Sequence, residues 1–291
     1  MLDSLNNYMN MTKLLSQRLV KPPLFCRHRE AITFAILLII FPIGVNAEFD
    51  HGSWNELLKK HVVVLDDGQA TQVNYEAMLK DRITITQYLE ELANVSRVEF
   101  DAWSSPEQLA FLINAYNAWT VELILREYPG LRSIRQIGFL PFSAWRRKIV
   151  WLFDEQHSLD EVEHGMIRGW GIYNEPRIHF AVNCAAIGCP ALRAEAYLGK
   201  SLDQQLEENT KLFLSDRTRN YYLDGQLYVS NIFNWYEEDF EQGWGGINSV
   251  SEFLLNYVTE LGLDSDGILF LEQERIRIRH LRYDWHLNKV Q

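Results

Sequence analysis

The chain has 291 residues, a formal net charge of −11 at pH 7, a hydrophobic fraction of 47% and nine tryptophans. This is the composition of a globular protein with an ample core, which excludes an intrinsically disordered chain. The acidic balance makes nucleic acid and anionic lipid poor candidate partners.

Residues 1–47 have the pattern of a signal peptide: a basic leader, an apolar run from Ala31 to Val45 and a small-residue ending at Ala47. A proline and a glycine interrupt the run, which is short for a bilayer span of about 20 residues, so cleavage is favoured over retention as an anchor. We expect an exported protein, periplasmic or secreted, that contacts a membrane only if this segment is retained. Its loss removes five basic and two acidic residues and changes the net charge from −11 to −14.

Residues 48–291 contain no internal repeat and no linker rich in proline, glycine or serine, and we predict a single domain. Helices are expected at 54–62, 75–93 and 106–128, with a short strand near Val73. The third of these is the strongest. Ser105-Pro106-Glu107-Gln108 provides its capping serine, its first-turn proline and its capping box, and Pro129-Gly130 ends it.

The rest of the chain mixes short strands with helices. The patterns predict strands at 148–152 and 178–184, helices at 158–170, 201–216, 235–240 and 249–259, a hairpin around Asp224-Gly225, and an extended C-terminus. Helices outnumber strands and do not alternate regularly with them. We therefore predict an α+β fold, rich in helices, with a small and mainly antiparallel sheet.

The segment 177–190 contains both cysteines of the mature chain together with His179. In a strand over 178–184, side-chain alternation places Cys184 with the core residues and His179 on the opposite face. Cys189 lies beyond that strand, before Pro190, where a helical turn is expected to begin. Backbone N–H groups at a helix start favour a thiolate, so Cys189 is the better nucleophile candidate.

Three other interpretations of the cysteines stay open. In an exported protein the Cys-x4-Cys pair can close into a disulfide, act in thiol–disulfide exchange, or remain two inert thiols. A zinc site is disfavoured by the spacing and by the lack of a second cysteine pair, and we predict neither a metal nor a cofactor.

Several other polar residues occur in apolar segments. His164 flanks the apolar face of its helix, and Asn114 and Asn117 lie next to each other on a helix that is apolar nearly all round. Buried amides need partners, so these two are expected either to fasten neighbouring loops or to orient a catalytic imidazole or a substrate. Asp284 is a candidate for the group that orients a histidine.

Five blocks follow one another between Ser105 and Asn288: FLINAYNA, SLDEVEHGMIR, the segment from Pro176 to Pro190, VSNIFNWYEEDF and YDWHLN. In this order they resemble the domain of unknown function 547 family. The resemblance implies a shared motif without an assigned activity. The positions that belong to the motif are Asn114, Tyr116, Asn117, His164, Arg168, His179, Cys184, Cys189, Pro190, Trp235, Asp239 and Asp284.

Our leading hypothesis is a papain-like thiol hydrolase or acyl transferase that acts on an amide or ester of a small molecule, peptide or protein. Cys189 would be the nucleophile, His164 or His179 the base, and Asp284 or Asn117 the orienting group. The residues expected to bind substrate are Asn114, Tyr116, Arg168 and Trp235. The rival hypothesis is a non-enzymatic envelope domain that is stapled by a Cys184–Cys189 disulfide and binds a protein partner.

Overall fold

The computed structural model describes residues 48–138, 140 and 143–290, and the described residues lie in one compact unit. The predicted signal peptide falls outside them. No helix in the described part of the chain is long and apolar enough to cross a membrane.

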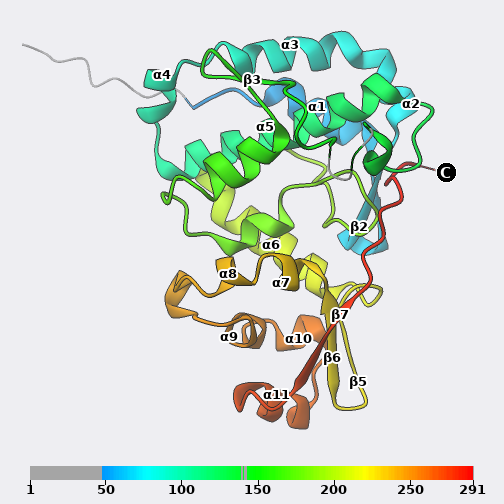
Figure 1. Ribbon diagram of the computed structural model, residues 1–291, viewed down its shortest axis with the longest axis vertical. Helices are drawn as coiled ribbons and strands as arrows, with labels where there is room; N and C mark the ends of the chain where they lie inside the picture. The colour runs from blue at the N-terminus through cyan, green and yellow to red at the C-terminus, as the bar shows by residue number, and fades with distance from the viewer. Residues whose placement is uncertain (1–47, 139, 141–142, 291) are drawn as a thin grey trace, which may run out of the picture. The chain divides into compact units, whose positions relative to one another are not determined.

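Helices dominate the fold and the strands are short, which confirms the α+β prediction (Figure 1). The helices are α1 (Gly52–His61), α2 (Tyr75–Met78), α3 (Arg82–Ala93), α4 (Arg97–Asp101), α5 (Ser105–Glu127), α6 (Leu202–Ser215), α7 (Ile232–Trp235), α8 (Glu237–Phe240), α9 (Val250–Leu255), α10 (Val258–Leu261) and α11 (Ser265–Glu272). The 3-10 helices are η1 (Asp66–Gly68), η2 (Leu79–Asp81), η3 (Ile134–Gln136), η5 (Pro176–Phe180), η6 (Gly199–Ser201) and η7 (Trp244–Gly246), while η4 (Glu161–Ile167) is a π-helix.

Seven strands form three small sheets among the described residues. The strands are β1 (Val62–Leu65), β2 (Ala70–Val73), β3 (Val150–Leu152), β4 (Glu155–His157), β5 (Tyr221–Leu223), β6 (Gln226–Ser230) and β7 (Arg277–Leu281). The pairs β1–β2, β3–β4 and β5–β6 are antiparallel, whereas β7 lies parallel to β6. Asp224 and Gly225 have positive φ angles of 50° and 73°, as a type I′ turn requires, and they join β5 and β6 in the predicted hairpin.

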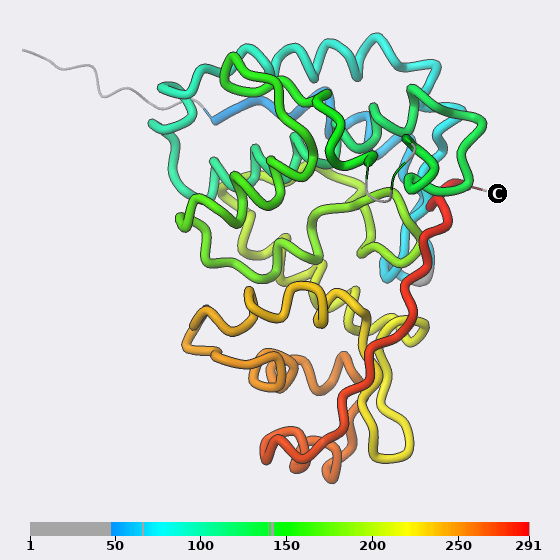
Figure 2. The backbone as a smooth tube through the Cα atoms, in the orientation of Figure 1, coloured from blue at the N-terminus to red at the C-terminus, as the bar shows by residue number. Residues whose placement is uncertain are grey.

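Two hydrophobic clusters make up the core. The larger is built on α1, α3 and α5, and the smaller lies under β5–β7 and α7–α11. Helix α6 belongs to both, with Leu202 and Leu206 in the larger cluster and Phe213 and Leu214 in the smaller one. The backbone trace shows α6 between the N-terminal helices and the C-terminal elements (Figure 2). The short helix η5 also connects the clusters, because Ile178 packs in one and Phe180 in the other.

Helix α5 is buried along most of its length, as its apolar sequence predicts. Its N-cap is Ser104, one residue earlier than expected, because the Glu107 N–H bonds to the Ser104 hydroxyl. The amides of Asn114 and Asn117 each hold a distant loop by two hydrogen bonds. Asn114 bonds to both backbone groups of Tyr197, at 2.8 and 3.0 Å, and Asn117 bonds to Ala181 O at 3.0 Å and to Asn183 N–H at 2.8 Å.

The strand predicted at 178–184 is wrong. Pro176 begins the 3-10 helix η5, and a side-chain oxygen of Glu175 accepts the Arg177 N–H. Beyond η5, the backbone groups of Ala181 and Asn183 form hydrogen bonds with the Asn117 amide and not with a neighbouring strand. The alternation of side chains along this segment therefore does not describe its geometry.

Three further predictions need correction. No helical turn follows Pro190, so Cys189 is not at a helix start. Cys184 was expected among the core residues, but Cys184 is only partly buried and Cys189 is the buried cysteine. The helix predicted over 75–93 is divided into α2, η2 and α3.

Replacing Asn117 with alanine should lower the free energy of unfolding by about 3 kcal/mol, because the change leaves two buried backbone groups without partners. Urea denaturation would measure the loss. Asn234→Ala, at an exposed position of α7, is the control and should change stability by less than about 0.5 kcal/mol. Equal effects of the two substitutions would contradict the role given to Asn117.

Candidate functional site

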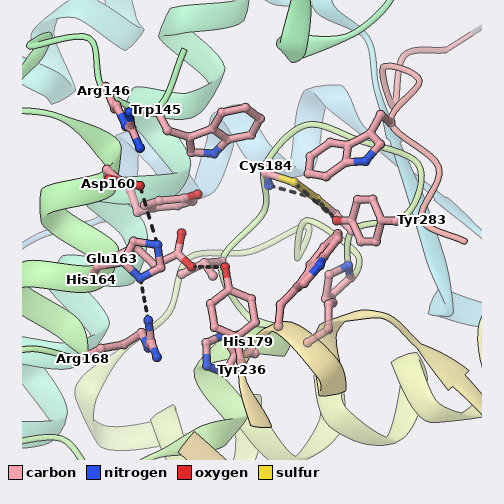
Figure 3. Close-up of a pocket in the computed structure, with 17 residues that line it drawn as sticks. Trp145, Arg146, Asp160, Glu163, His164, Arg168, His179, Cys184, Tyr236 and Tyr283 are labelled. Atoms are coloured by element: carbon pink, nitrogen blue, oxygen red, sulfur yellow. Dashed lines mark hydrogen bonds and ion pairs between the residues drawn. A yellow bond between two sulfur atoms is a disulfide. The ribbon is translucent and has the colours of Figure 1, made fainter. Parts of the chain in front are cut away.

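A pocket of about 380 Å³ collects most of the residues singled out in the sequence (Figure 3). In the close-up, Arg146, Asp160, His164 and Arg168 lie on one side, and Cys184 and Tyr283 lie on the other. The lining residues are Tyr116, Trp145, Arg146, Asp160, Glu163, His164, Arg168, His179, Val182, Cys184, Cys189, Pro190, Ile232, Trp235, Tyr236, Tyr283 and Trp285.

One wall of the pocket comes from η4 and its flanking residues. The predicted capping box begins this helix: Ser158 N–H bonds to the Glu161 carboxylate at 2.7 Å, and Glu161 N–H bonds to the Ser158 hydroxyl at 3.2 Å. The helix then widens into a π-helix, in which Arg168 N–H bonds to the carbonyl of Glu163, five residues earlier. Such segments are frequent at functional sites. This one turns four polar side chains toward the pocket: Asp160, Glu163, His164 and Arg168.

His179, Asp239 and Arg168 form a hydrogen-bonded chain beneath the pocket. His179 Nε2 lies 2.6 Å from Asp239 Oδ2, and Arg168 donates to both oxygens of the same carboxylate, at 2.5 and 2.9 Å. Burial alone would raise the pKa of Asp239, but the hydrogen bonds from His179 and Arg168 lower it to about 2. Asp239 is therefore a carboxylate at neutral pH and an acceptor for both neighbours.

The protonation state of His179 follows from these contacts. Burial lowers the pKa of His179, and the carboxylate of Asp239 only partly opposes this effect, so the ring is neutral at pH 7. Because Asp239 accepts a hydrogen bond from Nε2, the proton of the neutral ring is on Nε2 and Nδ1 keeps its lone pair. The Nδ1 atom is buried and has no hydrogen-bond partner. An imidazole oriented by a carboxylate, with its second nitrogen unprotonated, is the arrangement of a general base.

Glu163 and Tyr236 pack around this imidazole. The Tyr236 ring stacks on His179 with centroids 3.8 Å apart, and its hydroxyl donates to Glu163 at 2.7 Å. The Tyr116 hydroxyl also bonds to Glu163. Burial and the nearby Glu163 carboxylate raise the pKa of Tyr236, so this hydroxyl stays protonated at neutral pH.

His164 occupies a more accessible position, with 40% of its side chain exposed. Its Nδ1 accepts a hydrogen bond from Arg168 at 2.6 Å, and its Nε2 lies 3.6 Å from Asp160. A guanidinium can only donate, so the neutral ring carries its proton on Nε2. In this arrangement His164 offers the pocket a hydrogen-bond donor and not a base.

The cysteines occupy the opposite wall, where Cys184 and Cys189 form a disulfide. The sulfur of Cys189 lies near two hydrogen-bond donors, the Cys184 N–H at 3.0 Å and the Tyr283 hydroxyl at 3.1 Å. No hydrogen bond joins Cys189 to a histidine in the part of the chain that the structure describes. If the disulfide were reduced, both donors would favour a thiolate on Cys189.

The loop between the cysteines is closed by contacts other than the disulfide. The Asn183 side chain accepts the Ala185 N–H and donates to Pro190 O, both at 2.8 Å. The guanidinium of Arg219 donates to the carbonyl of Cys189. Ala185 adopts a φ of 60°, in the left-handed region, which turns the chain after Cys184. The two sulfurs are therefore held near each other by the loop itself.

The structure places some of the predicted site residues outside the pocket. Asn114 and Asn117 use their amides to hold loops, which is the structural alternative considered for them. Asp284 bonds to His286 at 2.6 Å in a neighbouring groove, and not to His164 or His179. Tyr116, Arg168 and Trp235 do line the pocket.

The carboxylate that orients His179 is Asp239, a position that the resemblance implies for the motif but that was not among the predicted site residues. Glu163 and Tyr283 were also missed. The signal for Glu163 was present, since it is an acidic residue next to His164 in a helix with an apolar face. No group of three or more His, Cys, Asp or Glu side chains is placed to hold a metal ion within residues 48–138, 140 and 143–290.

The fold and site define a helix-rich α+β protein with a polar pocket bounded by an acid–base network and a disulfide. Residues 100–214 match the model of a family described as "Protein of unknown function, DUF547", so this part of the chain is similar to that family. The matched residues contain the first three of the five sequence blocks, and for these blocks the match confirms the resemblance. The comparisons found no match among curated proteins or solved structures.

Burial lowers the pKa of His179, so the imidazole should stay neutral, with its proton on Nε2, until the pH falls below the ordinary value of 6.5. As the pH falls, the His179 ring of the unfolded chain binds a second proton at a higher pH than the ring of the folded chain does. His179 should therefore lower the free energy of unfolding as the pH falls below 6.5. Nitrogen-15 NMR of the histidine rings would report the tautomer and the pKa, with His179→Gln used for assignment. A His179 resonance that titrates at or above 6.5 would contradict this description.

Proposed function

We propose that the pocket is the active site of a thiol-dependent hydrolase or acyl transferase that acts on an amide or ester. Cys189 is the nucleophile and His179, oriented by Asp239, is the base. The observation that carries the proposal is the convergence on one pocket of a sulfur with two hydrogen-bond donors and a neutral imidazole oriented by a carboxylate.

The active form in this proposal is the reduced one. A dithiol supplies two electrons to the Cys184–Cys189 bond, which yields two thiols on this chain and a disulfide on the donor. Since Asn183 and Arg219 hold the loop independently of the disulfide, the positions of the two sulfurs are expected to persist after reduction.

The reaction uses each group in turn. Cys189 Sγ attacks the carbonyl carbon as His179 Nδ1 takes the thiol proton, and His164 Nε2–H bonds to the developing oxyanion. The C–O or C–N bond then breaks and the leaving atom takes the proton from His179. Water, or an acceptor nucleophile, attacks the thioester with the same base, the C–S bond breaks, and the proton returns to Cys189. Substrate binding must bring the sulfur and the imidazole into reach, as in other enzymes whose catalytic hydrogen bonds tighten in the complex.

We also propose export for this chain. The signal-like pattern of residues 1–47 and the disulfide between Cys184 and Cys189 support a periplasmic or secreted location, because disulfides persist in oxidising compartments. If the N-terminal segment is retained, it would anchor the protein to the membrane.

A second function is favoured by the disulfide itself. A bonded Cys189 is no nucleophile, and the domain would then be a non-enzymatic envelope protein whose loop is stapled by the bond. The bond closes a short loop and would contribute about 2 kcal/mol of stability. Replacing both cysteines with serine would then lower stability by that amount, while His179→Gln would leave the function unchanged.

Mild reduction followed by iodoacetamide should label Cys189 faster than Cys184, because hydrogen bonds favour the Cys189 thiolate. Tyr283→Phe removes one donor and should raise the pKa of Cys189, read from the pH dependence of the labelling rate, by about one unit. Peptide mass mapping identifies the labelled residue. Tyr221→Phe, in β5, is the matched control and should leave the rate unchanged. A faster reaction at Cys184 would overturn the assignment of the nucleophile.

The reduced chain should release nitrophenolate from p-nitrophenyl acetate in a burst and carry the acetyl group on Cys189. Cys189→Ala should abolish the burst, and Cys184→Ser should keep it. His179→Gln should slow acetyl transfer about 100-fold, since general base catalysis is worth about that much or more. Stopped-flow absorbance and intact-protein mass spectrometry would follow the two events. A burst that survives in Cys189→Ala would exclude Cys189 as the nucleophile.

A further inference from the structure

A second cavity adjoins the pocket and has a different electrostatic character. It is an open groove of about 1060 Å³, which we call the basic groove. Three aromatic residues line both cavities and so form their common wall: Trp235, Tyr283 and Trp285. The other residues of the basic groove are Arg132, Ser133, Arg135, Gln136, Asn231, His280, Leu281, Arg282, Asp284 and His286.

The charge of the groove is opposite to that of the protein. The groove has three arginines against one carboxylate, whereas residues 48–291 carry a formal net charge of −14. The carboxylate, Asp284, is already engaged by the His286 ring at 2.6 Å. Arg132 and Arg282 are exposed, and neither forms an ion pair with a described residue. Since charges more than about 8 Å away are largely screened at physiological ionic strength, these local cations decide what binds here.

The groove also borders an unpaired strand edge. In the sheet order β5-β6-β7, the strand β7 is at the edge and pairs only with β6. Every second residue of such a parallel edge strand turns its N–H and C=O away from the sheet. His280 and Leu281, at the end of β7, line the basic groove. A bound polypeptide in extended conformation can therefore form backbone hydrogen bonds at the place where the cations lie.

We propose that the basic groove binds an acidic peptide segment in extended conformation, and that the same peptide reaches the pocket past Trp235 and Trp285. The carboxylates of the peptide pair with Arg132 and Arg282, while its backbone adds to the edge of β7. This inference rests on the proposed function, because it makes an acidic polypeptide the substrate class of that site. The edge strand favours a peptide over other polyanions, which lack N–H and C=O groups at strand spacing.

The test is fluorescence anisotropy of the purified, oxidised chain with a labelled peptide of alternating glutamate and valine. We expect saturable binding that weakens as salt is raised and is lost when each glutamate is replaced by glutamine. Arg282→Glu should weaken binding about tenfold, whereas Arg282→Lys should keep most of it. Lys80→Glu reverses an exposed cation in η2, outside the groove, and should change the affinity less than about twofold.

Equal binding of the glutamate and glutamine peptides would overturn the proposal, and so would equal effects of Arg282→Glu and Lys80→Glu. Tighter binding of a sulfated oligosaccharide than of the acidic peptide would overturn the choice of a peptide. Because binding is measured on the oxidised chain, it is independent of catalysis. If the peptide does not bind but Cys189 is alkylated rapidly after reduction, the peptide proposal is refuted and the proposed function is not. If the peptide binds but Cys189 does not react, the proposed function is refuted and the peptide proposal is not.

Discussion

The Asn117 amide, buried in the middle of α5, is the constraint on which the site depends. It holds the backbone of Ala181 and Asn183, two of the four residues that separate His179 from Cys184. Asn183 in turn closes the cysteine loop through its own side chain. A single polar residue in an apolar helix therefore fixes where an imidazole and two sulfurs lie relative to the core. Buried amides are costly unless every group is paired, and here that requirement gives the loop a defined path.

The second organising element is the carboxylate of Asp239. It accepts hydrogen bonds from His179 and from Arg168, and Arg168 also donates to His164. One anion thus sets the tautomers of both histidines, one directly and one through a guanidinium. Arg168 follows η4, next to the larger hydrophobic cluster, whereas Asp239 lies in α8, next to the smaller one. The pocket therefore depends on contacts between the two halves of the core, which α6 and η5 hold together.

Much of the fold is predictable from local chemistry. The capping box at Ser158, the Asp224-Gly225 turn and the apolar α5 each correspond to an observed element, because caps, turn residues and uniform hydrophobicity act over a few residues. The segment at 178–184 was not predictable in this way. Its alternating pattern resembles a strand, but the partner of its backbone is a side chain more than 60 residues away. The role of Asp239 was not predictable for the same reason, because only folding brings Asp239 into contact with His179, which lies 60 residues earlier in the chain.

The π-helical form of η4 has a consequence for how its sequence can change. An α-helix advances about 100° per residue. The wider turn of η4 therefore contains one residue more than an α-helix that joins the same two ends. Deleting one residue before His164 would let the segment relax to α-helical geometry and keep its two ends in place. Side chains within the segment would then change orientation by up to about 100° relative to its fixed ends, and a different set of residues would face the pocket. Insertions and deletions in this short segment are thus expected to be more damaging than substitutions at its exposed positions.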